Sequence, residues 1–263
     1  MKLNVYQVDA FTTQIFAGNP AAVVPLNEWL PDDVMQDIAR ENNLSETAFF
    51  VPEGVGYRIR WFTPTVEVDL CGHATLASSH VLFTHLAFQG DMIYFSSRSG
   101  DLSVSREGDL YLLNFPADEP RPVEKDQLIL NCFDREPAAV LKGKADYLVV
   151  FEDEQYVRDV IPALDFIETL DAEGVIITAP GSGGTDFVSR FFAPQLGIPE
   201  DPVTGSAHTV LAPYWADRLG KEDLVARQVS QRGGDLQCRL NNNRVHIGGR
   251  AVTYLRGEAE LII

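Results

Sequence analysis

Two glycine turns, half a chain apart, carry the residues of this sequence that are best suited to acid–base chemistry. Gly72 is followed by His73, and Gly205 is followed by Ser206, with Asp201 shortly before the second turn. Each turn precedes a stretch with almost no charge that is predicted to be a helix. Such a helix start presents backbone N–H groups without intrahelical partners, which attract an anion. These groups together could move a proton and hold a carboxylate.

Glu46 and Asn19 are two further candidates in the first half of the chain. Glu46 lies in a predicted strand among apolar neighbours, and a carboxylate on the inner face would be partly desolvated, as proton transfer favours. Asn19 follows a glycine and offers a donor and an acceptor to a ligand. Position alone leaves ordinary alternatives open: a solvated strand residue for Glu46, a simple turn for Asn19, and helix-start roles for His73 and Ser206.

Three blocks of sequence recur in the same order at nearly constant spacing, which indicates an internal duplication. The blocks are residues 60–64 with 190–194, the turns at Gly72 and Gly205, and residues 99–102 with 233–236. Two copies are too few for a repeat array. They predict two similar lobes.

Each half predicts short strands around one helix. The first central helix, residues 73–86, has apolar residues on nearly every side and must be covered all round. Antiparallel strands with glycine turns between them could cover it. The other expected strands are 3–10, 21–24, 44–51, 57–63, 92–97, 102–106, 110–115, 147–151, 175–178, 187–192, 225–231, 236–240, 245–247 and 254–263, and the other helices are 31–42, 137–141, 154–161, 164–169 and 206–219.

Residues 116–126 are rich in proline and charge, so they are expected to separate the lobes. The predicted lobes are residues 1–117 and 118–263, and the last strand, about 253–263, could return to the first lobe. Ligand sites commonly lie at such junctions. The active site is therefore expected in the cleft between the lobes.

Composition excludes several classes of protein. The formal net charge of −17 over 263 residues argues against a nucleic-acid partner, which needs clustered Lys and Arg. The uncharged run 70–89 contains three histidines, which is atypical of a membrane span. The start of the chain alternates like a strand, unlike a signal peptide. Three cysteines without CxxC spacing favour neither a disulfide framework nor a zinc site, and a cytoplasmic location is expected.

Five segments in this order closely resemble the phenazine biosynthesis PhzF family, and they span nearly the whole chain. They are FAGNPAAV from residue 16, ENNLSETAF from 41, FTP from 62, CGHAT from 71 and EDPVTGSA from 200. The resemblance implies an α+β fold like that of the diaminopimelate epimerases. In that fold two pseudo-symmetric lobes each wrap an antiparallel, β-barrel-like sheet around a central buried helix. It also implies a homodimer.

The resemblance further implies the chemistry of the site. Glu46 matches the acid/base glutamate of the family, which moves a proton between two ring carbons of a dihydro-hydroxyanthranilate without a cofactor. No metal is implied, and the expected partner is a small anionic substrate. The matching residues are His73 and Asp201 as catalytic partners and Ser206, Gly72 and Gly205 as substrate-binding positions. Asn19 is a further substrate-binding candidate from its own position in the sequence.

One position departs from the related epimerases, which place a thiol before each glycine turn. Here Cys71 precedes the first turn, but Thr204 precedes the second. A hydroxyl cannot replace a thiolate as general base near neutral pH. The sequence therefore favours a single carboxylate that shuttles the proton, with Cys71 as a small buried apolar residue. Two alternatives stay open: an amino-acid epimerase that uses a different pair of bases, and a non-catalytic binding protein that retains the site.

Overall fold

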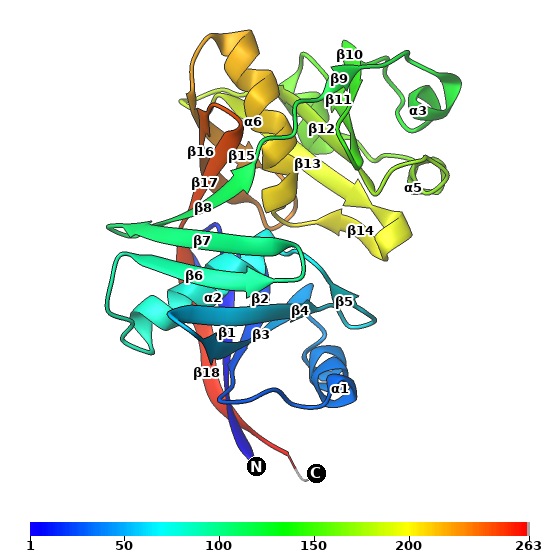
Figure 1. Ribbon diagram of the computed structural model, residues 1–263. Coiled ribbons are helices and arrows are strands. Elements are labelled where there is room, and N and C mark those ends of the chain that lie inside the picture. The colour runs from blue at the N-terminus through cyan, green and yellow to red at the C-terminus, as the bar shows by residue number, and fades with distance from the viewer. Residues whose placement is uncertain (262–263) are drawn as a thin grey trace. The chain divides into compact units, whose positions relative to one another are not determined.

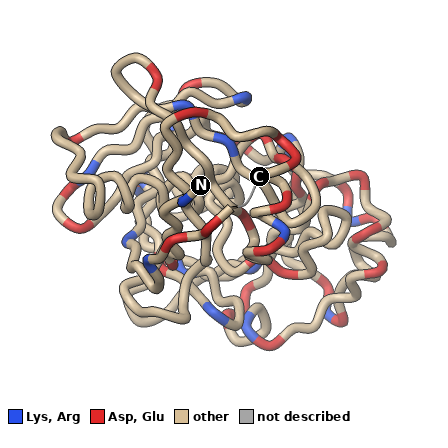
Figure 2. The backbone as a smooth tube through the Cα atoms, turned by 90° about the horizontal axis from the view of Figure 1, so that it is seen from below, with Lys and Arg blue, Asp and Glu red and all other residues tan. Residues whose placement is uncertain are grey.

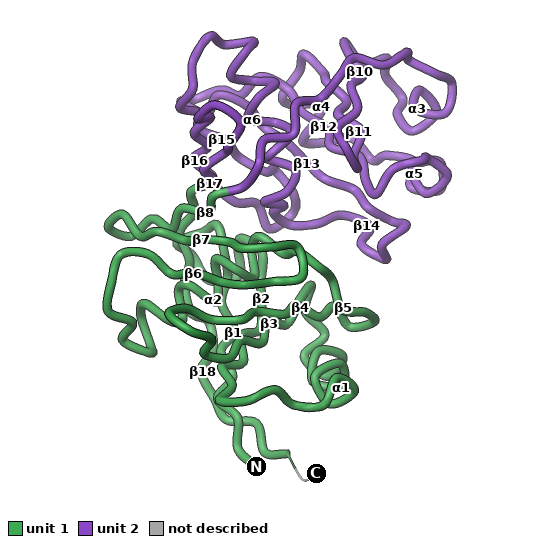
Figure 3. Tube along the Cα trace, in the orientation of Figure 1, with its two compact units in different colours: residues 1–114, 248–263 green, residues 115–247 purple. Residues whose placement is uncertain are grey.

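The computed structural model describes residues 1–261, and the chain divides into two compact units (Figure 3). Unit 1 comprises Met1–Asn114 and the C-terminal segment from Gly248, whereas unit 2 comprises Phe115–Ile247. Both units mix helices and strands.

Most elements of unit 1 come from the first half of the chain, and its last strand comes from the C-terminal segment (Figure 1). Its elements are β1 (Lys2–Ala10), β2 (Asn19–Pro25), α1 (Asp32–Asn42), β3 (Glu46–Glu53), β4 (Gly56–Phe62), β5 (Glu67–Val68), α2 (Gly72–Thr84), β6 (Met92–Ser97), β7 (Gly100–Glu107), β8 (Leu110–Pro116) and β18 (Ala251–Glu260). Strands β8 and β17 contain the two points at which the chain passes between the units.

Unit 2 begins with a short strand and a short helix. Its elements are β9 (Arg121–Pro122), α3 (Gln127–Asn131), β10 (Ala139–Lys142), β11 (Asp146–Val150), α4 (Glu154–Asp159), α5 (Leu164–Ile167), β12 (Gly174–Pro180), β13 (Phe187–Ala193), the 3₁₀ turn η1 (Pro194–Leu196), β14 (Ile198–Asp201), α6 (Gly205–Leu219), β15 (Asp223–Gln228), β16 (Gly234–Asn241) and β17 (Arg244–Gly249).

The two units repeat one pattern of strand pairing. In unit 1, β2 is parallel to β3, β3 and β5 are antiparallel to β4, and β6 is parallel to β4. In unit 2, β11 is parallel to β12, β12 and β14 are antiparallel to β13, and β15 is parallel to β13. The central helix follows the short strand, β5 or β14, in both units. This shared connectivity is the structural counterpart of the repeated sequence blocks. The expectation of an antiparallel sheet in each lobe is wrong in part, because both units also contain parallel pairs, which join strands across helical or loop connections.

An arginine–glutamate pair anchors the short strand before each central helix. Arg60 on β4 binds Glu67 on β5 through two hydrogen bonds of 2.7 and 2.8 Å, and Arg190 on β13 binds Glu200 on β14 at 2.6 and 3.0 Å. Each guanidinium also lies near the aromatic ring two residues further along, at 5.1 and 4.8 Å. Paired hydrogen bonds of this kind fix direction as well as distance. They hold each strand where it leads into the glycine turn.

The central helix of unit 1 is buried on all sides, as its sequence predicts. Every residue of α2 from His73 to Phe83 is buried, and the helix lies against β1, β2, β3 and β18 (Figure 1). Its hydroxyl groups remain hydrogen-bonded because Thr75, Ser78 and Ser79 donate to carbonyl oxygens four residues earlier. A polar side chain can therefore be buried in this helix without an unpaired donor.

Two histidines, His80 in the last part of α2 and His85 directly after it, contact the same threonine of β18. The Nδ1 of His80 lies 3.0 Å from the Tyr111 hydroxyl, and its Nε2 lies 2.9 Å from Oγ1 of Thr253 on β18. The Nε2 of His85 reaches the same threonine oxygen at 2.8 Å. Burial lowers the pKa of His80 to about 4 and also lowers the pKa of His85. Both rings are therefore neutral at pH 7, which makes this end of the helix sensitive to acid.

The sequence-based prediction of a helix at residues 137–141 is wrong. Residues Ala139–Lys142 form strand β10, which pairs with β11 in antiparallel register. The apolar run is too short for its own period to distinguish the two structures, and pairing with β11 decides for the strand. The short strands β5 and β14 were also not predicted.

Strand β18 pairs with β1 from Lys2↔Glu260 to Ala10↔Ala251, so the end of the chain belongs to unit 1. The last predicted strand runs to residue 263, and Ile262 and Ile263 lie outside the described residues.

Two surface properties bear on partners. Acidic side chains, 38 against 21 basic ones, are distributed along much of the chain and are not gathered in one segment (Figure 2). No helix among residues 1–261 is both long and apolar enough to cross a membrane.

Candidate active site

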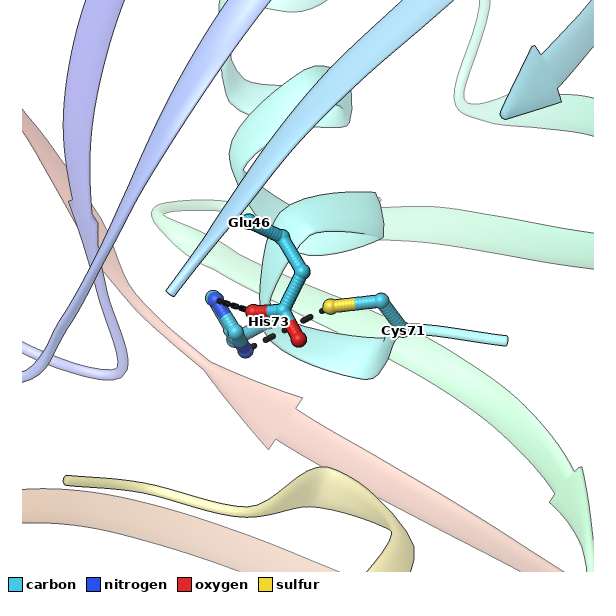
Figure 4. A group of neighbouring side chains, drawn as sticks. All are labelled: Glu46, Cys71 and His73. Carbon is cyan, nitrogen blue, oxygen red and sulfur yellow. Dashed lines mark hydrogen bonds and ion pairs between the residues drawn. The ribbon is translucent and has the colours of Figure 1, made fainter. Parts of the chain in front are cut away.

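Glu46 and His73 meet in unit 1 at the start of α2 (Figure 4). Glu46 is the first residue of β3, and His73 is the second residue of α2. The His73 Nε2 lies 3.1 Å from the Glu46 Oε2, and both residues are more than nine-tenths buried. Strand β3 places its first side chain here because β3 packs against α2 and runs parallel to β2. A buried carboxylate–imidazole pair is therefore present where the sequence predicted two catalytic residues.

The ionisation of this pair follows from its surroundings. Burial alone would lower the pKa of His73, but the neighbouring Cys71 sulfur and the Glu46 carboxylate outweigh it and raise the pKa above the ordinary histidine value. Burial, followed by the charge of Glu46, raises the pKa of the Cys71 thiol to about 11. The thiol is thus protonated at neutral pH. In that state the Cys71 sulfur stabilises the imidazolium only as a neutral hydrogen-bond acceptor near Nδ1, and the negative charge beside the ring is that of Glu46.

The other nitrogen of His73 faces Asn19 and Cys71. Its Nδ1 lies 3.2 Å from the Asn19 Nδ2 and 3.5 Å from the Cys71 Sγ. Asn19 is fully buried as the first residue of β2. Gly18 before it has φ of +65°, and a Cβ there would lie 2.1 Å from the Ala10 carbonyl oxygen. Only glycine fits this approach without strain, so the turn that positions Asn19 depends on it.

Two atoms of the pair have no hydrogen-bond partner in the part of the chain that the structure describes. They are the Glu46 Oε2 and the His73 Nε2, whose 3.1 Å contact is an ion pair without hydrogen-bond geometry. Buried polar atoms usually have a partner, and leaving one without costs free energy. Both atoms are thus available to a substrate proton or to a bound ion.

Asp201, Gly205 and Ser206 come together in unit 2, where they lie within or beside the turn before α6. The Thr204 hydroxyl donates a short hydrogen bond to the Asp201 Oδ2. Ser206 is exposed at the second position of α6, whereas Asp201 is buried. The predicted candidates of unit 2 therefore also form one local group.

The residue that precedes each central helix does not cap it. Cys71 before α2 and Thr204 before α6 make no side-chain capping hydrogen bond. Uncapped helix starts carry a partial positive charge and suit a carboxylate. Gly72 and Gly205 are the first residues of these two helices.

His208 is a structural residue and not part of the exposed helix start. It is fully buried on α6, its Nδ1 lies 2.8 Å from the Thr204 carbonyl oxygen, and its ring packs near Phe187 at 6.0 Å between centroids. Burial lowers its pKa to about 4, against the raising effect of the Thr204 carbonyl. The ring is neutral at pH 7 and donates from Nδ1.

Gln228 holds the Asp201 turn, and sequence analysis did not identify it. Its Oε1 accepts from the Thr204 N–H at 2.9 Å, while its Nε2 donates to the Asp201 carbonyl at 2.8 Å and lies 3.2 Å from the Thr204 Oγ1. The alternation of residues in β15 could have identified it. Exposed and buried positions alternate along this strand, and Gln228 occupies a buried position. A polar side chain in that phase indicates a buried hydrogen-bond network.

Replacing Gln228 by leucine is expected to destabilise unit 2 by about 2 kcal/mol or more, because the buried Thr204 N–H and Asp201 carbonyl both lose a partner. Gln237→Leu, on an exposed position of the neighbouring strand β16, is the matched control. Urea unfolding of both variants measures the difference. Equal stability of the two variants would show that the turn does not depend on Gln228.

Comparison with known proteins identifies the family. Residues 8–257 match the family model described as PhzC-PhzF, phenazine biosynthesis-like protein. An uncharacterized isomerase of Pseudomonas aeruginosa is 51% identical over 261 residues, which cover 99% of this chain and 100% of that protein. A crystal structure of a PhzF family protein from Enterococcus faecalis superimposes with a TM-score of 0.96 at 47% identity and covers 99% of this chain and 100% of that one.

A more distant structure, a hydroxyproline epimerase from Agrobacterium vitis, shares the fold alone. It has a TM-score of 0.62 at 9% identity and covers 98% of this chain and 92% of that one. The mixed α+β fold is therefore that of PhzF proteins and of proline racemase-like epimerases. The chain belongs to the phenazine biosynthesis-like PhzC/PhzF family.

Proposed function

We propose that the protein is a cofactor-independent isomerase that shifts a proton within a small carboxylate-bearing metabolite. The observation that carries this proposal is the buried Glu46–His73 pair, with 3.1 Å between Oε2 and Nε2. A relative that is 51% identical over nearly the whole chain is named an isomerase, which supports the class of reaction.

Glu46 acts as both base and acid in this proposal. Its carboxylate takes a proton from one carbon of the substrate, and the resulting carboxylic acid returns the proton to another carbon, so that a double bond migrates and no atom is lost. His73 stabilises the carboxylate through its imidazolium form and can exchange the proton with it. Asn19 lies beside the other ring nitrogen. Its Nδ2 can donate to Nδ1 of the neutral ring, whereas the imidazolium form, whose Nδ1 is a donor, requires the Asn19 amide to present its oxygen instead. Proton transfer by a positioned side chain of this kind contributes roughly 10²- to 10⁴-fold to a rate.

Within unit 1 the proposed carboxylate-binding position is Gly72, and within unit 2 the proposed positions are Gly205 and Ser206. The open N–H groups at the starts of α2 and α6 supply donors, and the exposed Ser206 hydroxyl supplies another. Asp201 polarises a second polar group of the substrate. The support for these roles is local to each helix start and follows from the chemistry of an uncapped N-terminus.

The state of Cys71 supports a carboxylate mechanism over a two-thiol epimerase mechanism. A base that must lose a proton near neutral pH needs a pKa close to 7, whereas burial raises the pKa of Cys71 to about 11. The equivalent position before α6 is Thr204, whose hydroxyl is bonded to Asp201. Neither residue is suited to take a proton from carbon.

Deuterium incorporation followed by NMR in D₂O tests the proposal. The panel consists of small carboxylates and includes trans-2,3-dihydro-3-hydroxyanthranilate, cyclic unsaturated acids and proline derivatives. We expect exchange at carbon or double-bond migration with at least one of them. Inversion of configuration at a single carbon would show epimerisation in place of the proposed reaction. No exchange with any compound of the panel, although the protein is folded, would favour a non-catalytic binding protein.

A further inference from the structure

The start of α2 gathers three different metal-ligating side chains in one buried place. One carboxylate oxygen of Glu46, the Sγ of Cys71 and a ring nitrogen of His73 all lie within 4.8 Å of one another (Figure 4). All three residues are more than nine-tenths buried. Within residues 1–261, no other group of three His, Cys, Asp or Glu side chains is this close together.

The separation between the Cys71 sulfur and the nearer His73 nitrogen fits that between two ligands of one tetrahedral zinc ion. Bond lengths of about 2.3 Å to sulfur and about 2.0 Å to nitrogen place two such ligands roughly 3.5 Å apart. The Cys71 Sγ and His73 Nδ1 are 3.5 Å apart. The Glu46 Oε2 is 3.1 Å from the other ring nitrogen, Nε2, so a single ion held by all three residues requires the Glu46 side chain to rotate toward the thiol side.

One of the three donor atoms has no partner to displace, because the Glu46 Oε2 carries no hydrogen bond to any described residue. The His73 Nδ1, which is the ring nitrogen beside the thiol, lies 3.2 Å from the Asn19 Nδ2, so an ion bound there replaces that contact. A set of one nitrogen, one oxygen and one sulfur suits Zn²⁺, which accepts all three, better than Mg²⁺ or Ca²⁺, which prefer oxygen. Three protein ligands leave a fourth position for water or a carboxylate.

We propose that Glu46, Cys71 and His73 reversibly bind one Zn²⁺ or a similarly thiophilic divalent ion, and that the bound ion inhibits the enzyme. On binding, the thiol and the coordinating ring nitrogen lose their protons to solvent, and sulfur, nitrogen and oxygen each donate a lone pair without any change of oxidation state. Glu46 then cannot receive a substrate proton. The proposal that an ion binds here does not depend on the proposed function. Only the proposed inhibition rests on that function.

Cadmium is a suitable probe, because the Cd²⁺–thiolate bond has an ultraviolet charge-transfer band and needs no substrate. Titration of tag-free protein is expected to produce the band with one equivalent of Cd²⁺, and Zn²⁺ is expected to remove it by competition. Cys71→Ala is expected to abolish the band. Cys238→Ala, a buried cysteine of β16 in unit 2, is the matched control and is expected to keep it.

A second variant tests whether Cys71→Ala loses the band through the missing ligand or through disturbed packing around residue 71. His73→Gln leaves Cys71 in place, removes one ligand and is expected to weaken Cd²⁺ binding by about 100-fold or more, since even the loss of an outer partner of a ligand costs about 10- to 100-fold. The absence of a band in the wild type, or an equal band in Cys71→Ala, would overturn the proposal. With an accepted substrate, Zn²⁺ is expected to inhibit the wild type and to spare Cys71→Ala. Equal inhibition of both would disprove the inhibitory role.

Discussion

Glu46→Gln is expected to lower substrate-dependent deuterium exchange by roughly 10²- to 10⁴-fold while the fold stays intact. The amide has the shape of the carboxylate but cannot accept a proton from carbon. His73 remains 3.1 Å away in the wild-type geometry and cannot by itself replace the shuttle between two carbons. NMR exchange rates in D₂O measure the loss, and circular dichroism and urea unfolding verify the fold.

Two variants make the result specific. Glu46→Asp retains the carboxylate but draws it back by one methylene, so its rate is expected to lie between those of the wild type and Glu46→Gln, because an error of about 1 Å can cost roughly 10²-fold. Glu41→Gln changes an exposed glutamate of α1 and is expected to leave the rate unchanged. A Glu46→Gln enzyme that keeps near-normal turnover would remove Glu46 from the mechanism.

Acid is expected to destabilise the protein through His80 in unit 1 and His208 in unit 2. Burial lowers the pKa of each to about 4, whereas an unfolded chain titrates near the ordinary value of 6.5. Below pH 6.5 the unfolded state therefore binds more protons than the native state. The free energy of unfolding decreases as the pH is lowered from about 6.5 to about 4. Each histidine removes about 2 kcal/mol by pH 5 and about 3 kcal/mol by pH 4.

Variants isolate these contributions from those of other groups. His73 and Asp146 have raised pKa values, so they bind protons in the native state and change stability in the opposite direction. The measured quantity is therefore the difference in unfolding free energy between pH 7 and pH 5, compared between variant and wild type. His80→Gln and His208→Asn are each expected to shrink the acid-induced loss by about 2 kcal/mol. His246→Gln, at a partly exposed position of β17, is the control for removing a histidine. An unchanged pH difference in His80→Gln would contradict the assignment.

The sequence by itself determined the family, the duplication and the main elements. The Gly72 and Gly205 turns could be recognised because each is followed by a largely uncharged helix. A pattern among neighbouring residues can be read directly from the sequence. The blocks around Arg60 and Arg190 recur because each performs the same local task, an ion pair with the following short strand.

Only the tertiary structure decided which of these residues act together. Glu46 and His73 are far apart in the chain, and the packing of β3 on α2 sets their 3.1 Å contact. Position alone could not distinguish a solvated Glu46 from a buried one, since burial depends on the elements that cover a side chain. Gln228 was missed because its partners, Asp201 and Thr204, belong to another segment. The protonated state of Cys71 likewise follows from burial, which is a property of the folded chain and not of the residue type.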